Sequence, residues 1–191
     1  TNKFGVKERK YLAGKAFQHV AHYDTLISEY LRGNDEFSET LTVALTKVSD
    51  LRYGENPHQK GSFYKLDSTK LPNQGFGSFV QHHGKDLSYV NLLDADAAFN
   101  LVNDYSDNAI AIIKHTNPCC LAVGNEELDV LFEKALTQGD AISAYGGIIA
   151  TNKNIDMKFA DKIRTLLSPI NGIRMFYEIV VCSSIDQDAL D

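Results

Sequence analysis

Hydrophobic residues recur at intervals of three and four positions over residues 8–31, and this spacing predicts an amphipathic helix. The apolar positions are Leu12, Ala16, Val20, Tyr23, Ile27 and Leu31. Asp24 could cap a second helix if the first one breaks at Tyr23. Residues 33–35 are Gly, Asn and Asp, which favour a turn, so we expect the helical segment to end there.

Shorter patterns follow the helical segment. Apolar and polar side chains alternate over residues 41–48, which predicts a strand, and residues 62–66 predict a second one. The segment 50–59 between them contains Gly54 and Pro57, two residues that interrupt regular structure, so we expect it to form a loop.

Strand patterns and helix patterns alternate from about residue 77 to the end. The expected strands cover residues 79–80, 109–113, 148–150 and 176–182, and the expected helices cover 91–105, 126–138 and 155–167. Such alternation predicts an α/β layered sheet whose strands are joined by largely parallel crossover connections.

The most informative of these patterns is the strand at 109–113. Its small and β-branched residues predict a buried strand, and it ends abruptly at Lys114 and His115. Ligands of open α/β sheets bind at the carboxyl ends of strands. A lysine supplies a positive charge and three hydrogen-bond donors, and a histidine can take or give a proton near neutral pH. From this pattern alone we expect a solvated turn, and a catalytic pair is the alternative.

Composition narrows the classes of partner. The chain has 191 residues, enough for one domain with a real core, or for one domain and part of another. Its net charge of −6 gives no general attraction to nucleic acid or to an anionic membrane, so neither is an expected partner. No apolar run approaches the length of a membrane span. Cys119, Cys120 and Cys182 suggest no disulfide framework, so we expect a cytoplasmic protein.

Two loops carry further candidate chemistry. Arg52, Tyr53 and His58 crowd the loop 50–59 with hydrogen-bonding groups, and the planar fork of an arginine suits phosphate or carboxylate. The pattern favours a ligand site and an ordinary polar connection equally. Gly146 and Gly147, in the turn before the strand at 148–150, let the backbone approach a ligand closely.

Metal binding is not expected. The run Pro118-Cys119 matches the start of the P-C-x-x-C signature of zinc deaminases, but Ala122 occupies the position of the second cysteine, and no H-x-E sequence is present. His82 and His83 are adjacent, and neighbouring residues of a strand point to opposite faces, so we expect them in solvent.

Three separated motifs occur in the same order as in a known protein family. They are LRYGENPHQ at 51–59, IKHTNPC at 113–119 and DAISAYGGIIATN at 140–152. The chain resembles the bifunctional purine biosynthesis family, AICAR formyltransferase/IMP cyclohydrolase. The match covers nearly the whole chain, whose first and last residues look like those of a fragment. By this resemblance residues 1–40 are the end of the cyclohydrolase domain and 41–191 the first half of the formyltransferase domain.

The resemblance also implies a fold, a reaction and partners. The fold would be a cytidine-deaminase-like layered sheet without zinc, with flanking helices, preceded by the last helices of an upstream domain. The reaction would transfer a formyl group from the co-substrate 10-formyltetrahydrofolate to AICAR, and the parent protein would also close formyl-AICAR to IMP. The family forms homodimers with shared active sites.

Site residues follow from the same resemblance. His115 would take the proton of the AICAR amine, and Lys114 would stabilise the charge on the formyl oxygen. The residues expected to hold the nucleotide are Arg52, Tyr53, His58 and Asp140 by side chains, and Gly146 and Gly147 by backbone.

Two departures from the family pattern favour an alternative. Cys120 stands where the bacterial pattern has glycine, and a side chain there would strain the loop if the position requires a positive φ. Residues 168–175 look like an extra or altered loop before the last strand. The alternative is a non-catalytic nucleotide-binding or dimerisation fragment derived from the enzyme.

Overall fold

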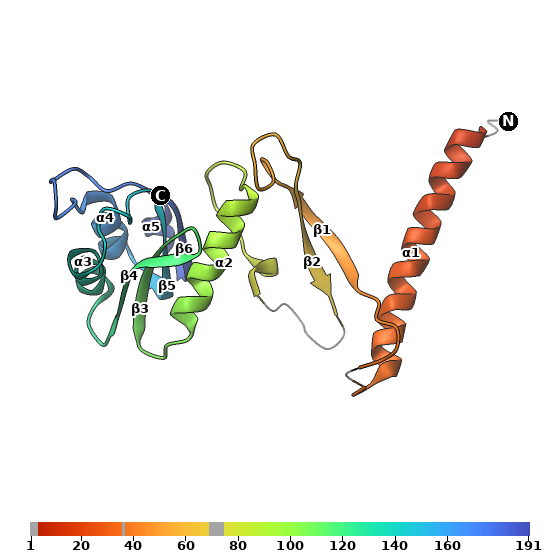
Figure 1. Cartoon of the computed structure of the whole chain (residues 1–191), viewed down its shortest axis with the longest axis horizontal. Helices are drawn as coiled ribbons and strands as arrows, with labels where there is room; N and C mark the ends of the chain where they lie inside the picture. The colour runs from red at the N-terminus through yellow and green to blue at the C-terminus, as the bar shows by residue number, and fades with distance from the viewer. Residues whose placement is uncertain (1–3, 36, 69–74) are drawn as a thin grey trace. The chain divides into compact units, whose positions relative to one another are not determined.

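The computed structural model of the protein describes residues 4–35, 37–68 and 75–191 (Figure 1). The chain divides into two compact units. The first contains Thr1–Leu51 and Lys60–Lys85, and the second contains Arg52–Gln59 and Asp86–Asp191. None of the helices in the described ranges is long and apolar enough to cross a membrane.

The first unit contains one long helix and a hairpin. Its elements are α1 (Val6–Arg32), β1 (Ala44–Asp50), β2 (Ser62–Asp67) and a short 3-10 helix, η1 (Gly75–Ser78). The helix α1 is continuous, so the break considered at Tyr23 does not occur. The two strands predicted in this region are present as β1 and β2, which pair antiparallel, whereas no strand forms at residues 79–80. His22 Nε2 lies 3.0 Å from the Asp67 carboxylate and links α1 to β2.

The second unit is a four-stranded mixed sheet with helices. Its elements are α2 (Tyr89–Asn103), β3 (Asn108–Lys114), β4 (Asn117–Gly124), α3 (Leu128–Gln138), β5 (Gly147–Ile155), α4 (Met157–Thr165), β6 (Tyr177–Ile185) and α5 (Gln187–Leu190). The strand order is β4-β3-β5-β6. The predicted helices and strands of this region are confirmed as elements, with β4 as an addition. The mixed α/β class with flanking helices is confirmed as well.

The prediction of largely parallel connections is wrong for β3. This strand pairs antiparallel with β4 on one side and with β5 on the other, and β5 and β6 form the parallel pair. The reason lies in a tight turn at His115 and Thr116, which reverses the chain directly into β4. Pro118 is tolerated there because β4 is an edge strand of the sheet, where a missing N–H is not needed. Helix α3 then carries the chain across β3 to β5.

The two faces of β3 are both buried, and all five residues at 109–113 are at most 1 % exposed. Ile110 and Ile112 belong to the hydrophobic core that includes Phe132 of α3 and Phe159 of α4, whose rings meet edge to face at 5.6 Å. Alternation along the strand directs Ala109 and Ala111 to the opposite face, which α2 contacts. A strand covered on both sides is held firmly, and this fixes the position at which Lys114 emerges.

Candidate functional site

The turn between β3 and β4 has an unusual backbone. His115 and Thr116 have φ values of 53° and 61°, in the left-handed region. Two-residue hairpins favour this conformation because it matches the twist of the strands, but the usual residues there are Asn and Gly. Each non-glycine residue in the left-handed region costs of order 1–3 kcal/mol, so surrounding structure must hold the turn.

Asp94, on α2, holds that turn. Its Oδ2 accepts a hydrogen bond from the backbone N–H of His115 at 3.2 Å, and its Oδ1 accepts one from the N–H of Thr116 at 2.7 Å. The side chain is buried, with 8 % of the residue exposed. The sequence pattern did not mark Asp94 as a site residue. No sequence signal points to it, because the partners are 21 and 22 residues away.

Lys114 connects the turn to the segment before β5. Its Nζ donates a hydrogen bond to the backbone carbonyl of Tyr145 at 2.9 Å. The next residue, Gly146, has a φ of 75° and donates its N–H to the carbonyl of Phe176 at 2.8 Å. The structure thus brings the predicted Lys114 and Gly146 into one neighbourhood.

Gly147 is needed for close packing of the strands. A Cβ at this position would lie 2.9 Å from the carbonyl oxygen of Ile113 and 3.0 Å from Cγ2 of Ile112. The first contact is closer than side chains tolerate, and the second is tighter than most Cβ contacts. The requirement for glycine here therefore comes from the approach of β3, and a backbone contact with a ligand stays a prediction.

Asp140 organises the turn that begins the segment. Its carboxylate accepts hydrogen bonds from the N–H groups of Ile142 (3.1 Å) and Ser143 (3.0 Å) and from the Ser143 hydroxyl (2.6 Å). These bonds, with the one from the Ser143 hydroxyl the largest contribution, hold the pKa of Asp140 below its usual value. The group is therefore an anion that already shapes its own turn, and a nucleotide contact remains a prediction.

The loop 52–59 is tied to the start of α2. The N–H of Arg52 donates to the carbonyl of Leu87 at 2.9 Å, and the N–H of Tyr89 donates to the carbonyl of Tyr53 at 3.1 Å. The Arg52 guanidinium stacks 4.9 Å from the centre of the Tyr53 ring. Its Nη2 also donates to the Tyr53 hydroxyl (3.2 Å) and to Oδ1 of Asn91 (3.4 Å).

His58 lies apart from this arrangement. Its residue is exposed, and its side chain has no hydrogen-bond partner among the described residues. The structure therefore brings Arg52 and Tyr53 together, and the ligand contacts of Arg52, Tyr53 and His58 all stay predictions.

The first turns of α2 connect the predicted motifs. Ser88 caps the helix with Asn91, in a reciprocal pair of side-chain and backbone bonds. Asn91 contacts Arg52, and Asp94 contacts the backbone of His115. Residues three positions apart lie on one face of a helix, so this face reaches both the loop and the turn at His115 and Thr116.

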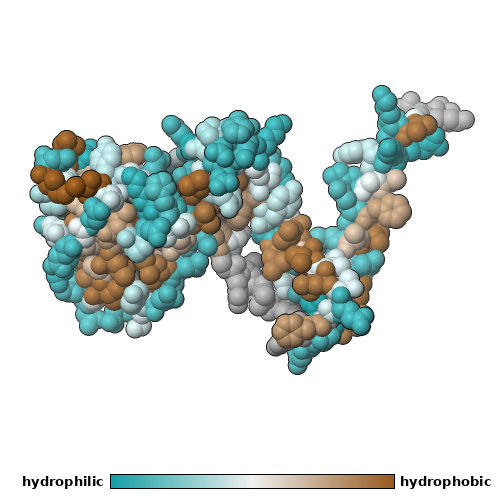
Figure 2. Space-filling view, viewed as in Figure 1, coloured by the Kyte–Doolittle hydropathy of each residue, from teal (hydrophilic) through white to brown (hydrophobic). Residues whose placement is uncertain are grey.

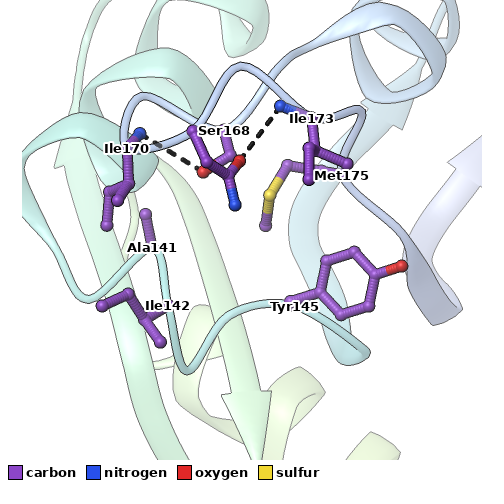
Figure 3. A pocket seen from close by; sticks show the side chains of 8 residues that line it. Ala141, Ile142, Tyr145, Ser168, Ile170, Ile173 and Met175 are labelled. Carbon is purple, nitrogen blue, oxygen red and sulfur yellow. Dashed lines mark hydrogen bonds between the residues drawn. The ribbon is translucent and has the colours of Figure 1, made fainter.

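A pocket of about 290 Å³ lies next to Tyr145 (Figure 3). Its lining residues are Ala141, Ile142, Tyr145, Ser168, Ile170, Asn171, Ile173 and Met175. The loop 168–175 forms one wall and the turn before β5 forms the other. Backbone bonds from Ser168 N to Ile173 O (2.8 Å) and from Gly172 N to Ser168 O (2.9 Å) shape the loop. Sequence reasoning marked this loop as altered but did not foresee the pocket.

Comparison with known proteins decides the family. A family model described as "AICARFT/IMPCHase bienzyme" matches residues 1–191. The chain belongs to this family. The Bifunctional purine biosynthesis protein PurH of Caldicellulosiruptor saccharolyticus is 40% identical over 187 residues, which are 95% of this chain and 34% of that protein.

Other relatives show the same coverage. The Bifunctional purine biosynthesis protein PurH of Bacillus cereus strain 03BB102 is 42% identical over 190 residues, 97% of this chain and 35% of that protein. The one of Ruminiclostridium cellulolyticum is 41% identical over 191 residues, 97% of this chain and 34% of that protein. The chain therefore spans about a third of the length of these relatives.

The departure from the family pattern at Cys120 causes no backbone strain. Among the described non-glycine residues a positive φ occurs at His115 and Thr116, so the expected strain at Cys120 is wrong. Cys120 lies within β4 opposite Ile112 and is 3 % exposed. Burial raises the pKa of its thiol to about 11. The side chain is part of the hydrophobic core.

Within the described part of the chain, no three His, Cys, Asp or Glu residues lie together as a group that could hold a metal ion. His82 and His83 are exposed, as expected. The absence of zinc from the protein stays a prediction.

Proposed function

We propose that the protein takes part in purine biosynthesis by transferring a formyl group from 10-formyltetrahydrofolate to the 5-amino group of AICAR. The observation that carries this proposal is the turn at Lys114 and His115. It emerges from a doubly covered strand, is held by Asp94, and contacts the segment before β5 through Lys114.

The chemistry assigns each side chain one task. The AICAR amine attacks the formyl carbon, and His115 takes the proton that the amine loses. The carbonyl π electrons move to the formyl oxygen, where Lys114 stabilises the negative charge. The oxyanion then re-forms the C=O bond as the C–N bond to N10 of the folate breaks, and N10 takes the proton from protonated His115 and leaves as tetrahydrofolate, with the formyl group now on the AICAR nitrogen. An ammonium group has three donors, so Lys114 can bond the oxyanion while it keeps its bond to Tyr145.

Nucleotide binding is assigned to the neighbouring groups. Both side-chain bonds of Arg52 use Nη2, which leaves Nε and Nη1 to bind a phosphate or carboxamide. Tyr53, His58 and Asp140 are proposed to complete the nucleotide contacts, together with the backbone of Gly146 and Gly147.

The pocket beside Tyr145 supports a place for the formyl donor. Its walls are largely apolar, and it adjoins the residue whose carbonyl holds Lys114. A flat ring system can be buried against Ile and Met side chains, with Ser168 and Asn171 at hand for polar groups. Its volume of about 290 Å³ suits part of a folate rather than the whole molecule.

We also propose the fold type, the second activity of the parent protein, its location and its oligomeric state. The mixed sheet with helices agrees with a cytidine-deaminase-like layering, and the parent protein would also carry IMP cyclohydrolase activity and work in the cytoplasm. Helix α1 has no buried residue among its 27, and hydrophobic side chains reach the surface along it (Figure 2). Such an apolar face favours association, so a homodimer with shared active sites is proposed.

Turnover measurements test the function. The polypeptide encoded by the natural reading frame that carries these residues is incubated with AICAR and 10-formyltetrahydrofolate, and the formation of tetrahydrofolate is followed. We expect turnover that His115→Ala abolishes or strongly reduces. Binding of AICAR without any turnover by the wild-type protein would overturn the enzymatic proposal and favour the non-catalytic nucleotide-binding module.

A further inference from the structure

One carboxylate controls the backbone of the turn that carries the proposed catalytic pair. The two oxygens of Asp94 each accept one bond, from the consecutive N–H groups of His115 and Thr116. Both donors belong to residues in the left-handed region. A non-glycine residue is strained in the left-handed conformation, so the turn needs a partner whose hydrogen bonds stabilise that conformation.

The remaining contacts of the turn do not replace this partner. The Thr116 hydroxyl and the Asn117 amide both donate to the carbonyl of His115 at 2.7 Å, so they satisfy an acceptor within the turn itself. Asp94 comes from a different element, α2, and is anchored in the buried face of that helix. It therefore relates the turn to a fixed part of the fold.

We propose that Asp94 is a positioning residue for formyl transfer: by binding both N–H groups it fixes the direction in which the side chains of Lys114 and His115 leave the end of β3. This inference rests on the proposed function. Loss of the carboxylate frees the turn to relax toward an ordinary backbone conformation, which moves the imidazole away from the attacking amine. Displacements of about 1 Å at a reacting group can lower the rate by about 10²-fold.

A compensating substitution distinguishes this role from a general effect on folding. Glycine adopts a positive φ without steric cost, so Thr116→Gly removes part of the need for Asp94. We expect Asp94→Ala to lower kcat by roughly 10- to 100-fold with the KM for AICAR changed by less than about threefold. The double variant Asp94→Ala/Thr116→Gly should recover a large part of that loss.

Two further variants serve as controls. Asp94→Asn keeps the shape and one acceptor oxygen, so its kcat should lie between those of the wild type and Asp94→Ala, and it replaces Asp94→Ala if that variant does not fold. Asp96→Ala removes a carboxylate from the same helix. It should leave kcat unchanged, because the bonds to the described turn come from Asp94.

Hydrogen–deuterium exchange tests the two hydrogen bonds to Asp94 independently of enzymatic activity. The amides of His115 and Thr116 should exchange more rapidly in both Asp94 variants than in the wild type, and at unchanged rates in Asp96→Ala. A kcat of Asp94→Ala equal to that of the wild type would overturn the positioning role alone. That role is also overturned if activity falls while exchange at 115 and 116 is unchanged and Thr116→Gly gives no rescue. Absence of formyl transfer in the wild type would overturn the proposed function and, with it, the catalytic consequence of Asp94.

Discussion

The ammonium group of Lys114 lies 2.9 Å from the carbonyl oxygen of Tyr145, a residue 31 positions later in the chain. This bond joins the end of β3 to the turn that precedes β5. It also places one wall of the pocket of about 290 Å³ next to a proposed catalytic residue, since Tyr145 lines that pocket. A lysine restrained in this way presents its remaining donors in a defined direction.

Substitution of the proposed catalytic pair, Lys114 and His115, should affect turnover more than binding. His115→Ala should lower kcat by roughly 10²–10⁴-fold, the usual share of general base catalysis. Lys114→Ala should also act mainly on kcat, because the oxyanion charge exists only in the transition state. Arg52→Ala should instead weaken AICAR binding first. Steady-state kinetics with calorimetric titration of AICAR separate these effects, and a near-normal kcat with lost affinity in His115→Ala would make His115 a binding residue.

Gly147→Ala should destabilise the sheet. The added Cβ would approach the Ile113 carbonyl to 2.9 Å, and the strands must separate to accept it. We expect a loss of about 1–3 kcal/mol in the free energy of unfolding, as for other overpacked sites. Denaturant titration measures this loss. Gly14→Ala is the matched control: nothing lies within 4 Å of its added Cβ, and the helix interior favours alanine by about 0.5–1 kcal/mol.

Tyr177→Phe should be neutral or stabilising. The hydroxyl of Tyr177 is buried and has no hydrogen-bond partner among the described residues. Burial also raises the pKa of this phenol far above its usual value. Removal of an unpaired polar group saves about 1–3 kcal/mol of desolvation, while the packing against Phe132 at 5.8 Å is kept. Thermal unfolding compares it with Tyr177→Ala, which should lose about 3–5 kcal/mol. A clear loss in Tyr177→Phe would show that the hydroxyl has a partner.

The cysteines should react slowly near neutral pH. The thiolate is the reactive form, and burial raises the pKa of each of the three thiols, to about 11 for Cys120. Below its pKa each group stays protonated, so alkylation by iodoacetamide should accelerate only as the pH rises into the alkaline range. Cys119 should react before Cys120, since Lys114 partly offsets the rise in its pKa. Mass spectrometry after timed alkylation gives the order, and rapid labelling of Cys120 at pH 7 in the folded protein would contradict it.

The sequence predicted the parts of the fold that local pattern determines. A run of small and β-branched residues at 109–113 can hardly be anything but a buried strand, and the helix spacing of α3 is equally clear. The direction of β3 relative to β5 could not be predicted, because the residue pattern of a strand does not determine which strand it pairs with or in which direction. The strand β4 was missed because Asn117 and Pro118 resemble the start of a loop, and an edge position that tolerates proline is known only from the sheet.

The residues of the candidate site could be predicted where several polar or ionisable side chains are neighbours in one short segment. Lys114 and His115 stand out as neighbours at the end of a strand, and so do Arg52 and Tyr53 in their loop. Asp94 and Asn91 did not stand out, because polar residues in a helix are ordinary and their partners lie on other elements. The pocket beside Tyr145 depends on how the loop 168–175 folds back, a long-range property that no short motif contains.

The antiparallel direction of β3 has a consequence for how this family can diversify. Because β3 runs against β5 and β6, its carboxyl end meets the amino ends of those two strands. The connections that enter β5 and β6, residues 140–146 and 168–176, therefore border Lys114 while the covered sheet lies behind them. In this chain the second connection closes back through the isolated bridge between Leu167 and Arg174. Natural variation or engineering can thus remodel the rim beside Tyr145 without repacking the hydrophobic interior.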